Sequence, residues 1–155
     1  MAKIKRSEFL TYIDTVGDGT YYLLGVGVIE GEVSMNPKTS EETYIHEDNA
    51  RISVESYAPT MPLEITAHNG DEVFEFLDGL RKNRAVLGDA ETTIVNVWNY
   101  ESGGPSAAPA EQQAVSIQVD AFGGPGGQAV KLKVTINYQG DPVTGTFNTG
   151  TKAFT

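Results

Sequence analysis

Two neighbouring segments in the C-terminal half of the chain alternate apolar and polar residues. The segments are QAVSIQVDAF (residues 113–122) and VKLKVTINY (residues 130–138). A period of two places one kind of side chain on each face of a β-strand, so each segment predicts a strand with one apolar and one polar face. The glycine-rich sequence GGPGGQ joins them and predicts a hairpin with a mobile tip. Such a hairpin must bury its apolar face, which favours a sheet packed on a core.

Further strands are expected on the same grounds. Their segments are 21–33 (YYLLGVGVIEGEV), 50–57 (ARISVESY), 63–67 (LEITA), 92–100 (TTIVNVWNY) and 141–148 (DPVTGTFN). Residues 50–57 and 63–67 alternate and predict strands with one wet face. The last segment is expected at a sheet edge, because Pro142 cannot donate a ladder hydrogen bond.

One amphipathic helix is predicted over residues 70–83. Val73, Phe74, Leu77 and Leu80 form a single apolar stripe at helical spacing. Acidic residues lie in the first turn and basic residues in the last, as the helix dipole favours. About seven short strands and one helix in 155 residues predict a single, mainly β domain. We expect a β-sandwich or partly open barrel with the helix on one flank.

Other segments carry no strand or helix pattern. Residues 1–20 are polar and mixed in sign, and they predict an N-terminal arm. Residues 34–49 predict a long polar loop, and loops of that length are commonly functional. Residues 101–112 are rich in glycine, proline and alanine and predict a flexible loop.

The composition limits what the chain can do. A net charge of −10 argues against sequence-independent binding of nucleic acid and against docking on an anionic membrane. The absence of cysteine excludes disulfides, thiolate nucleophiles and cysteine-based zinc sites. No apolar run approaches the ~18 residues of a membrane span, and no apolar stretch follows the basic N-terminus as it would in a signal peptide.

Candidate catalytic and metal sites are weak. His46 and His68 are the two histidines, and the run from His46 to Asp48 cannot converge on one ion. Glu55 and Glu64 lie on polar strand faces, as glycosidase carboxylates can, but solubilising charge explains them better. We therefore expect no enzyme activity, no metal and no cofactor.

Taken together, the chain resembles the major tail tube proteins of long-tailed, siphovirus-type bacteriophages and their prophage relatives. The resemblance covers nearly the whole chain and lies in the order and spacing of segments. They are YYLLGVGV, the loop NPKTSEETYIHEDN, SYAPTMPLEIT, the helix DEVFEFLDGLRKN and the terminal INYQGDPVTGTFN, which is the most specific.

The resemblance implies a β-sandwich with a flanking helix that self-assembles into hexameric rings. In that family the inner sheets join into a continuous β-barrel, and stacked rings form the conduit for DNA ejection. The long loop and both terminal segments bridge subunits and rings, which here correspond to residues 34–49, 1–20 and 148–155. Tape-measure, tail-tip and terminator proteins are the implied partners. The subunit would be made in the bacterial cytoplasm and end in the virion tail.

An acidic wall would let double-stranded DNA pass without being held. Glu55, Glu64 and Asp120 lie on polar strand faces and are the candidates for the lumen wall, although the outer wall suits them equally. Lys131 and Lys133 count against the hairpin's polar face as the lumen unless acids pair with them. In the long loop, the candidate inter-subunit contacts are Pro37, Tyr44 and Ile45.

Three alternatives stay open. The chain could be the tube protein of a contractile tail, a tailocin or a secretion device, which share the fold. It could be a carbohydrate-binding β-sandwich, although Trp98 lies in an apolar strand rather than on an exposed platform. A glycoside hydrolase that uses Glu55 and Glu64 is the third.

Overall fold

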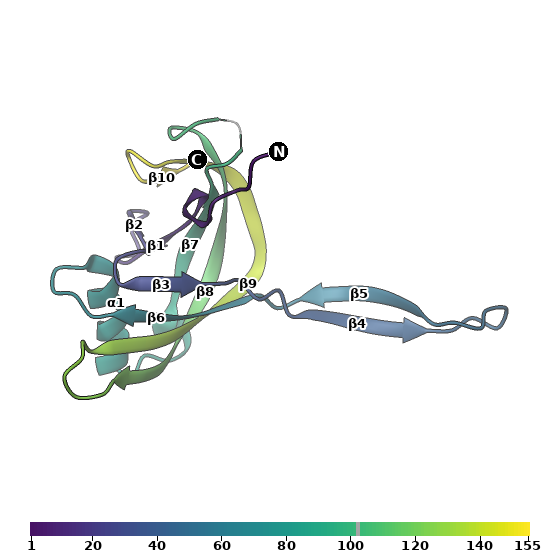
Figure 1. Ribbon diagram of the computed structural model, residues 1–155, viewed down its shortest axis with the longest axis horizontal. Coiled ribbons are helices and arrows are strands. Elements are labelled where there is room, and N and C mark those ends of the chain that lie inside the picture. Colours follow the sequence, from purple (N-terminus) through teal and green to yellow (C-terminus); the bar gives the residue numbers. More distant parts are fainter. Residues whose placement is uncertain (102) are drawn as a thin grey trace.

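The computed structural model describes residues 1–101 and 103–155, and a two-stranded arm extends from one large curled sheet (Figure 1). The strands are β1 (Phe9–Asp14), β2 (Tyr21–Leu23), β3 (Val28–Gly31), β4 (Pro37–Glu42), β5 (Arg51–Tyr57), β6 (Thr60–Thr66), β7 (Glu91–Trp98), β8 (Ala108–Gly123), β9 (Lys131–Asn148) and β10 (Ala153–Phe154). The helical elements are α1 (Glu72–Lys82) and the short 3-10 turns η1 (Arg6–Glu8) and η2 (Leu87–Ala90). We call residues 37–57 the arm; it comprises β4, β5 and the tip that joins them.

The predicted hairpin is the centre of the sheet. The strands follow the order β2-β1-β7-β8-β9-β6-β3, every neighbouring pair is antiparallel, and β10 pairs with the end of β9. Ile117 faces Ile136 and Val119 faces Val134 across the β8–β9 pair. The alternation at 113–138 therefore predicted both strands and their pairing correctly.

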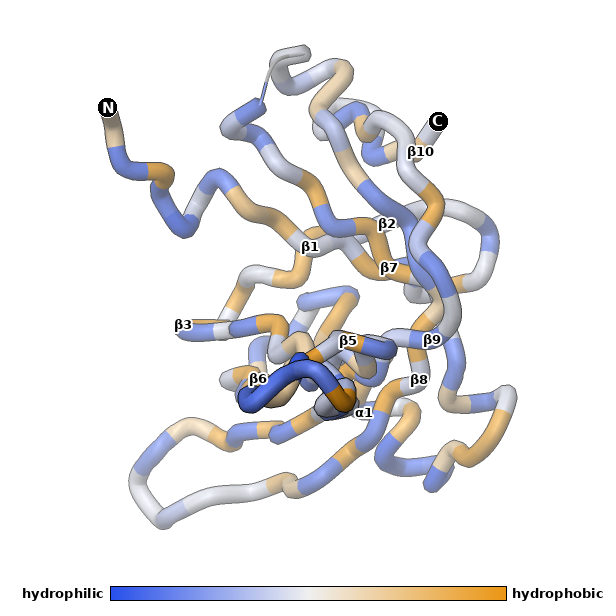
Figure 2. Tube along the Cα trace, turned by 90° about the vertical axis from the view of Figure 1, so that its right-hand side faces the viewer, coloured by the Kyte–Doolittle hydropathy of each residue, from blue (hydrophilic) through white to orange (hydrophobic). Residues whose placement is uncertain are grey.

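The sheet curls into an open half-barrel, which Figure 2 shows looking along the arm. The β8–β9 register shifts twice, once between Gln112 and Ala114 and once between Val119 and Ala121. Such bulges bend a strand and increase its twist. The predicted partly open barrel with one flanking helix is confirmed.

The larger hydrophobic cluster lies between the sheet and α1. Val73 and Leu77 of α1 are fully buried there with residues such as Ile65, Ile94 and Ile117 from the strands. The predicted helical stripe therefore packs as expected. Asp71 caps the helix, because its carboxylate accepts a hydrogen bond from the Val73 backbone amide at 3.3 Å.

A second cluster lies on the opposite face of the sheet. Tyr12 belongs to it while its neighbour Ile13 belongs to the first cluster, so β1 is buried on both faces. Phe147 fills its centre, with ring centroids 4.5 Å from Tyr12 and 6.0 Å from Tyr21. The curl of the sheet brings β9 over β1 in this cluster, although the two strands are not neighbours.

Several boundary predictions were wrong. Residues 1–20 are not all an arm, because β1 is a core strand; four apolar residues among residues 9–13 suffice to bury it. Residues 34–49 are not one loop, because β4 pairs with β5 across them. In the predicted loop 101–112, β8 already begins at Ala108, whose small side chain is buried; Ser102 lies outside the described residues.

Two further segments differ from expectation. Residues 141–148 are not a separate strand, because they continue β9. The predicted C-terminal tail, residues 148–155, folds back as β10, and Phe154 packs against the second cluster. Residues 50–57 do form a strand, but all its side chains are exposed, so its apolar residues Ile52 and Val54 face no core.

Candidate assembly surfaces

Among the described residues, the free strand edges of the sheet include those of β2 and β3, at the two ends of the strand order, and part of β8. β7 pairs with β8 only as far as the Glu91–Ser116 pair, so residues 117–123 of β8 pair with β9 alone. β3 pairs with β6 and, in the part of the chain that the structure describes, has no strand on its outer side. A free edge presents unpaired backbone donors and acceptors that another strand can use.

The directions of the β3 and β8 edges match. The strands β8, β9, β6 and β3 alternate in direction, so β3 runs opposite to β8. When a second copy is placed beside the first, its β8 edge meets the β3 edge in antiparallel orientation. Repeating that contact extends one sheet through successive copies.

The polar face of these four strands carries two of the three predicted lumen residues. Glu64 pairs with Lys131 at 3.2 Å between Oε1 and Nζ. Asp120 lies at the second β8 bulge, where it accepts hydrogen bonds from Gln118 at 2.6 Å and from the Thr135 hydroxyl at 2.7 Å. Glu64, Asp120, Lys131 and Lys133 line a groove of about 440 Å³.

This face is close to charge balance. Glu30, Glu64 and Asp120 oppose Lys131 and Lys133 along the same groove. The lysines that counted against a lumen role are thus accompanied by acids, and one of them is ion-paired.

Glu55, the third predicted lumen residue, lies elsewhere. It is on β5 in the arm, where Lys38 Nζ lies 3.8 Å from its carboxylate. Glu55 and Glu64 therefore belong to different sheets and line no common pocket among those described. The arrangement does not support the paired carboxylates of a glycosidase.

The arm is a ribbon with little support from the rest of the molecule. Pro37 pairs with Tyr57 at its root, and Tyr44 and Ile45 lie exposed at its tip, where Ile45 is fully exposed. Arg51 pairs with Glu47 at 2.7 Å and stacks over Tyr44. Because an isolated two-stranded hairpin is marginally stable in water, this ribbon is expected to order fully against a partner.

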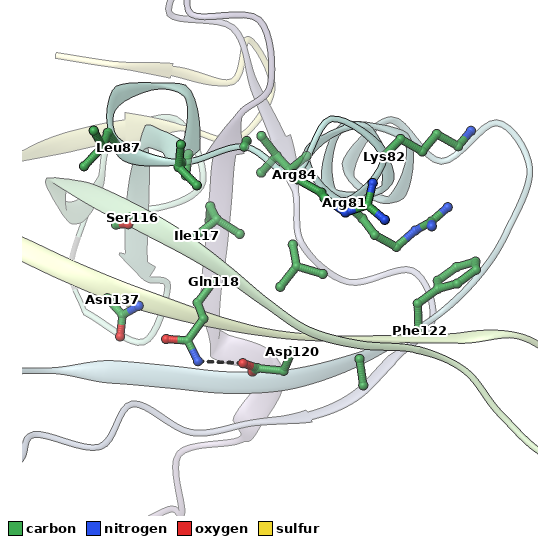
Figure 3. Close-up of a pocket in the computed structure, with 16 residues that line it drawn as sticks. Arg81, Lys82, Arg84, Leu87, Ser116, Ile117, Gln118, Asp120, Phe122 and Asn137 are labelled. Carbon is green, nitrogen blue, oxygen red and sulfur yellow. Dashed lines mark hydrogen bonds between the residues drawn. The ribbon is translucent and has the colours of Figure 1, made fainter.

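A groove of about 860 Å³ runs between the C-terminal end of α1 and the free edge of β8; we call it the helix-end groove (Figure 3). Arg81, Lys82 and Arg84 line its helix side, and Phe122 lies opposite them. The Arg81 guanidinium lies 3.9 Å from the Phe122 ring centroid. The sequence run RKNR was the available signal for this basic groove, but by itself it indicates only the basic end of a helix.

The Asp78 carboxylate forms ion pairs with two of these basic side chains. Arg81 Nε lies 2.7 Å and Lys82 Nζ 3.2 Å from its oxygens. Burial acts to raise the pKa of Asp78, but the hydrogen bonds and charges of Arg81 and Lys82 outweigh it and lower the pKa. Arg84 is exposed, so this end of the helix carries more positive than negative charge.

The backbone after α1 is strained. Arg84 has φ +47° and Leu87 has φ +53°, a region that residues other than glycine seldom adopt. Arg84 occupies the left-handed position of a Schellman motif, in which the Ala85 amide donates to the Leu80 carbonyl at 3.0 Å. This geometry leaves Val86 66% and Leu87 85% exposed beside the groove.

Neither histidine belongs to a metal site among the described residues. His46 stacks on Tyr44 in the arm, and His68 Nδ1 lies 2.9 Å from the Thr66 carbonyl. The described part of the chain holds no group of three or more potential ligands. Trp98 is half-buried at the end of β7, so it is a poor sugar platform. Within the same residues, no helix combines the length and apolar character needed to cross a bilayer.

Comparisons with known proteins place the fold. No protein-family model and no curated protein matches the sequence. The SPP1 tail tube is similar in structure, with a TM-score of 0.69 and 13% identity over 93% of this chain and 80% of that one. The tail of an empty GTA particle, of C6 symmetry, gives a TM-score of 0.66 and 12% identity over 91% of this chain and 98% of that one.

The tube-terminating cap of the anti-feeding prophage is also similar, with a TM-score of 0.55 and 13% identity over 94% of this chain and 93% of that one. The chain thus has the phage tail tube fold, as the sequence predicted. The likeness includes phage-type tails and the tube cap of the anti-feeding prophage, and it does not separate siphovirus tails from the rest.

Proposed function

We propose that this chain is the repeating subunit of a phage tail tube, in which copies close into rings and rings stack into a hollow conduit. The free β3 and β8 edges carry this proposal. Their directions allow β3 of one copy to pair with residues 117–123 of the next, which would join the four-stranded sheets into one barrel. A hexamer is the expected ring, since the GTA tail of the same fold has C6 symmetry.

In this ring the face opposite α1 lines the bore. Glu64, Asp120, Lys131, Lys133 and Thr135 would then meet the lumen, and Glu55 would not. A wall on which acids and lysines balance holds no cluster of free cations, and such a wall does not bind DNA by counterion release. We expect double-stranded DNA to pass through it without specific binding.

The arm would bridge rings. Pro37, Tyr44 and Ile45 remain the proposed contacts, because their exposed apolar surface needs a partner. The other proposed partners are a tape-measure protein and tail-tip and terminator proteins, with assembly in the bacterial cytoplasm and the virion tail as the final location. We propose no enzymatic activity.

The tube of another phage-like particle, such as a contractile device, is the second candidate, and the similarity to the tube-terminating cap of the anti-feeding prophage supports it. The tail tube and the tube of a contractile device would both be built through the free edges of β3 and β8. A sheath gene beside the gene for this chain would select the contractile device.

The proposal is tested by negative-stain electron microscopy of the purified protein at rising concentration, with light scattering for mass. Hollow tubes or rings are expected, with tail-tip proteins added if the subunit alone stays monomeric. Failure to polymerise even with those proteins would refute the tube.

A matched pair of variants tests the edges. Ile29→Lys places a charge on the free β3 edge, where Ile29 is exposed, and is expected to abolish rings while the subunit stays folded. Val16→Lys alters another exposed aliphatic residue, in the β1–β2 loop, and is expected to leave rings intact. Normal rings from Ile29→Lys would rule out the β3 edge as the ring contact.

A further inference from the structure

The curled sheet leaves a pocket beside the free edge of β3. This pocket of about 580 Å³ lies between β3 and the β1–β2 hairpin, where the two ends of the strand order approach without pairing (Figure 2). We call it the seam pocket. Met61 and Leu63 in its lining belong to the larger hydrophobic cluster, and Leu24 and Val28 pack against that cluster. An apolar side chain placed in the seam pocket would therefore extend the core.

The segment after α1 carries exposed aliphatic side chains that its own subunit does not use. Val86 is 66% and Leu87 is 85% exposed. The Schellman motif explains the left-handed backbone at Arg84, but Leu87 has a left-handed φ of +53° outside that motif. This conformation is an outlier for a bulky residue, and outliers of this kind cluster at functional sites. Leu87 is thus held away from its own core at a cost, which favours a contact with another molecule.

The exposed segment lies beside the free edge of β8. Leu87 lines the helix-end groove together with Ser116 and Ile117 (Figure 3), and Ser116 is the last residue of β8 that pairs with β7. Across the ladder, Ile117 pairs with Ile136, which pairs with Met61 in the seam pocket. The segment and the pocket therefore lie at one level along the strands, at opposite edges of the four-stranded sheet.

Both features also lie on the α1 side of the sheet. The helix-end groove includes residues of α1, and Val28 of the seam pocket packs against the cluster that contains Val73 and Leu77 of α1. When the β8 edge of one copy lies against the β3 edge of the next at the same ladder level, Val86 and Leu87 come to the mouth of the neighbour's seam pocket.

The charges around the two features are complementary. The lining of the helix-end groove has an excess of positive charge, and Arg84 is exposed there without an ion pair to any other described residue. In the seam pocket, the exposed Glu30 and Glu32 outnumber Arg6. Opposite charges on facing surfaces steer association and disfavour wrong partners.

We propose that Val86 and Leu87 of one copy insert into the seam pocket of its neighbour in the same ring. The proposal rests on the tube function and adds a side-chain contact to the paired backbone edges. Backbone pairing alone allows strands to slip in register, and this contact would fix the register between copies. The contact is heterologous, because segment and pocket differ, and a heterologous contact gives a ring when its rotation closes.

Cysteine cross-linking tests the insertion directly, because the native chain has no cysteine. One protein carries Leu87→Cys, and a second carries Leu23→Cys, since Leu23 lines the seam pocket and is 41% exposed. A bis-maleimide linker can then join these two chains only through a contact between copies. The matched control replaces Leu87→Cys by Val16→Cys, because Val16 is exposed and lines neither the groove nor the seam pocket.

We expect the Leu87–Leu23 pair to cross-link about tenfold more than the control, because insertion holds the two thiols at a high effective concentration. Equal yields in a sample that contains rings would overturn the insertion and leave the tube function intact. Absence of rings even with tail-tip proteins would refute the tube function, and the insertion with it.

Filling the pocket supplies the second test. A Cβ at Gly31 would lie 3.7 Å from Arg6 Nη2 and from Met61 Sδ, which is ordinary van der Waals contact, so Gly31→Leu should occupy the seam pocket without disturbing the subunit. We expect an unchanged melting temperature for the isolated subunit and a severalfold loss of ring mass.

Shortening the inserted side chain should compensate. Leu87→Ala, added to Gly31→Leu in the same chain, is expected to restore rings, because it makes room in the filled pocket. The control adds Val16→Ala instead and should restore nothing. Normal rings from Gly31→Leu alone would overturn the insertion, and so would an equal effect of the two second-site changes, whether both restore rings or neither does.

Discussion

At the scale of single residues, the structure separates side chains that hold the fold from side chains kept despite a cost to it. Phe147 belongs to the first kind, since it is fully buried between two tyrosine rings. Arg84 belongs to the second kind, because its backbone occupies a region that glycine adopts more easily. The two kinds respond differently to mutation.

Arg84→Gly should make the isolated subunit more stable. Removing the side chain relieves the left-handed conformation, which costs a non-glycine residue about 1 kcal/mol. We expect the free energy of unfolding to rise by about 0.5–1 kcal/mol in urea denaturation. Arg84→Ala is the control, since it removes the charge and keeps the strain. Equal stability of the two variants would contradict the strain argument.

Glu111 gives a pH-dependent prediction. Burial raises the pKa of its carboxyl, so the folded protein holds that proton more tightly than the unfolded chain does. This tighter proton binding stabilises the folded protein fully at pH values below the pKa of Glu111 in the unfolded chain. The stabilisation is lost as the pH rises through the raised pKa of Glu111 in the folded protein. Glu111→Gln should therefore increase the melting temperature at pH 7, and the gain should vanish near pH 4.

The measurement is thermal unfolding of both proteins at the two pH values. Glu91→Gln, at an exposed position at the start of β7, is the control and should change neither melting temperature. A gain from Glu111→Gln that persists unchanged at pH 4 would mean that packing, not ionisation, is the cause.

At the scale of elements, the sequence predicted best where local pattern and burial agree. The alternating apolar residues of β8 and β9 and the apolar stripe of α1 all face the core, so the predicted elements agree with the structure. The same alternation in β5 predicted a strand correctly but not its surroundings. Ile52 and Val54 are exposed because the ribbon leaves the sheet, and periodicity within a segment does not tell what covers it.

Elements whose own sequence pattern is weak were not predicted, because their burial depends on residues that are distant in sequence. β1 lies between charged flanks, and its burial on both faces depends on β7 and on Phe147, which is far away in sequence. Ala108 and Ala110 are core residues of β8 although alanine is typical of many environments. The groove after α1 combines helix end, strand edge and loop, and no single segment encodes it.

The arm can be removed without touching the core. Pro37 and Tyr57 are cross-strand partners, so a two-residue Asn-Gly turn can join them in place of residues 38–56. We expect the free energy of unfolding to change by no more than about 1 kcal/mol, as for exposed sites generally. Tubes should be lost, while rings can still form through the edges. Circular dichroism melts and electron microscopy measure the two outcomes, and normal tubes would refute the bridging role.

At the scale of the whole molecule, charge opposes assembly. Each copy has a net charge of −10, so closing a ring brings many like charges together. The excess positive charge at the helix-end groove is far smaller than the net charge of the copy. The long-range repulsion should therefore dominate the dependence of assembly on salt.

Raising the ionic strength from about 0.01 M to about 0.15 M shortens the Debye length from about 30 Å to about 8 Å. Because screening then removes most repulsion between copies, the critical concentration for tube formation, measured by pelleting, should fall. Arg84→Glu replaces a positive by a negative charge and so makes the net charge of each copy more negative by two. We expect this variant to have a higher critical concentration than the native chain at low salt, and the difference to shrink as salt rises. A critical concentration that increases with salt would show instead that ion pairs between copies outweigh their net repulsion.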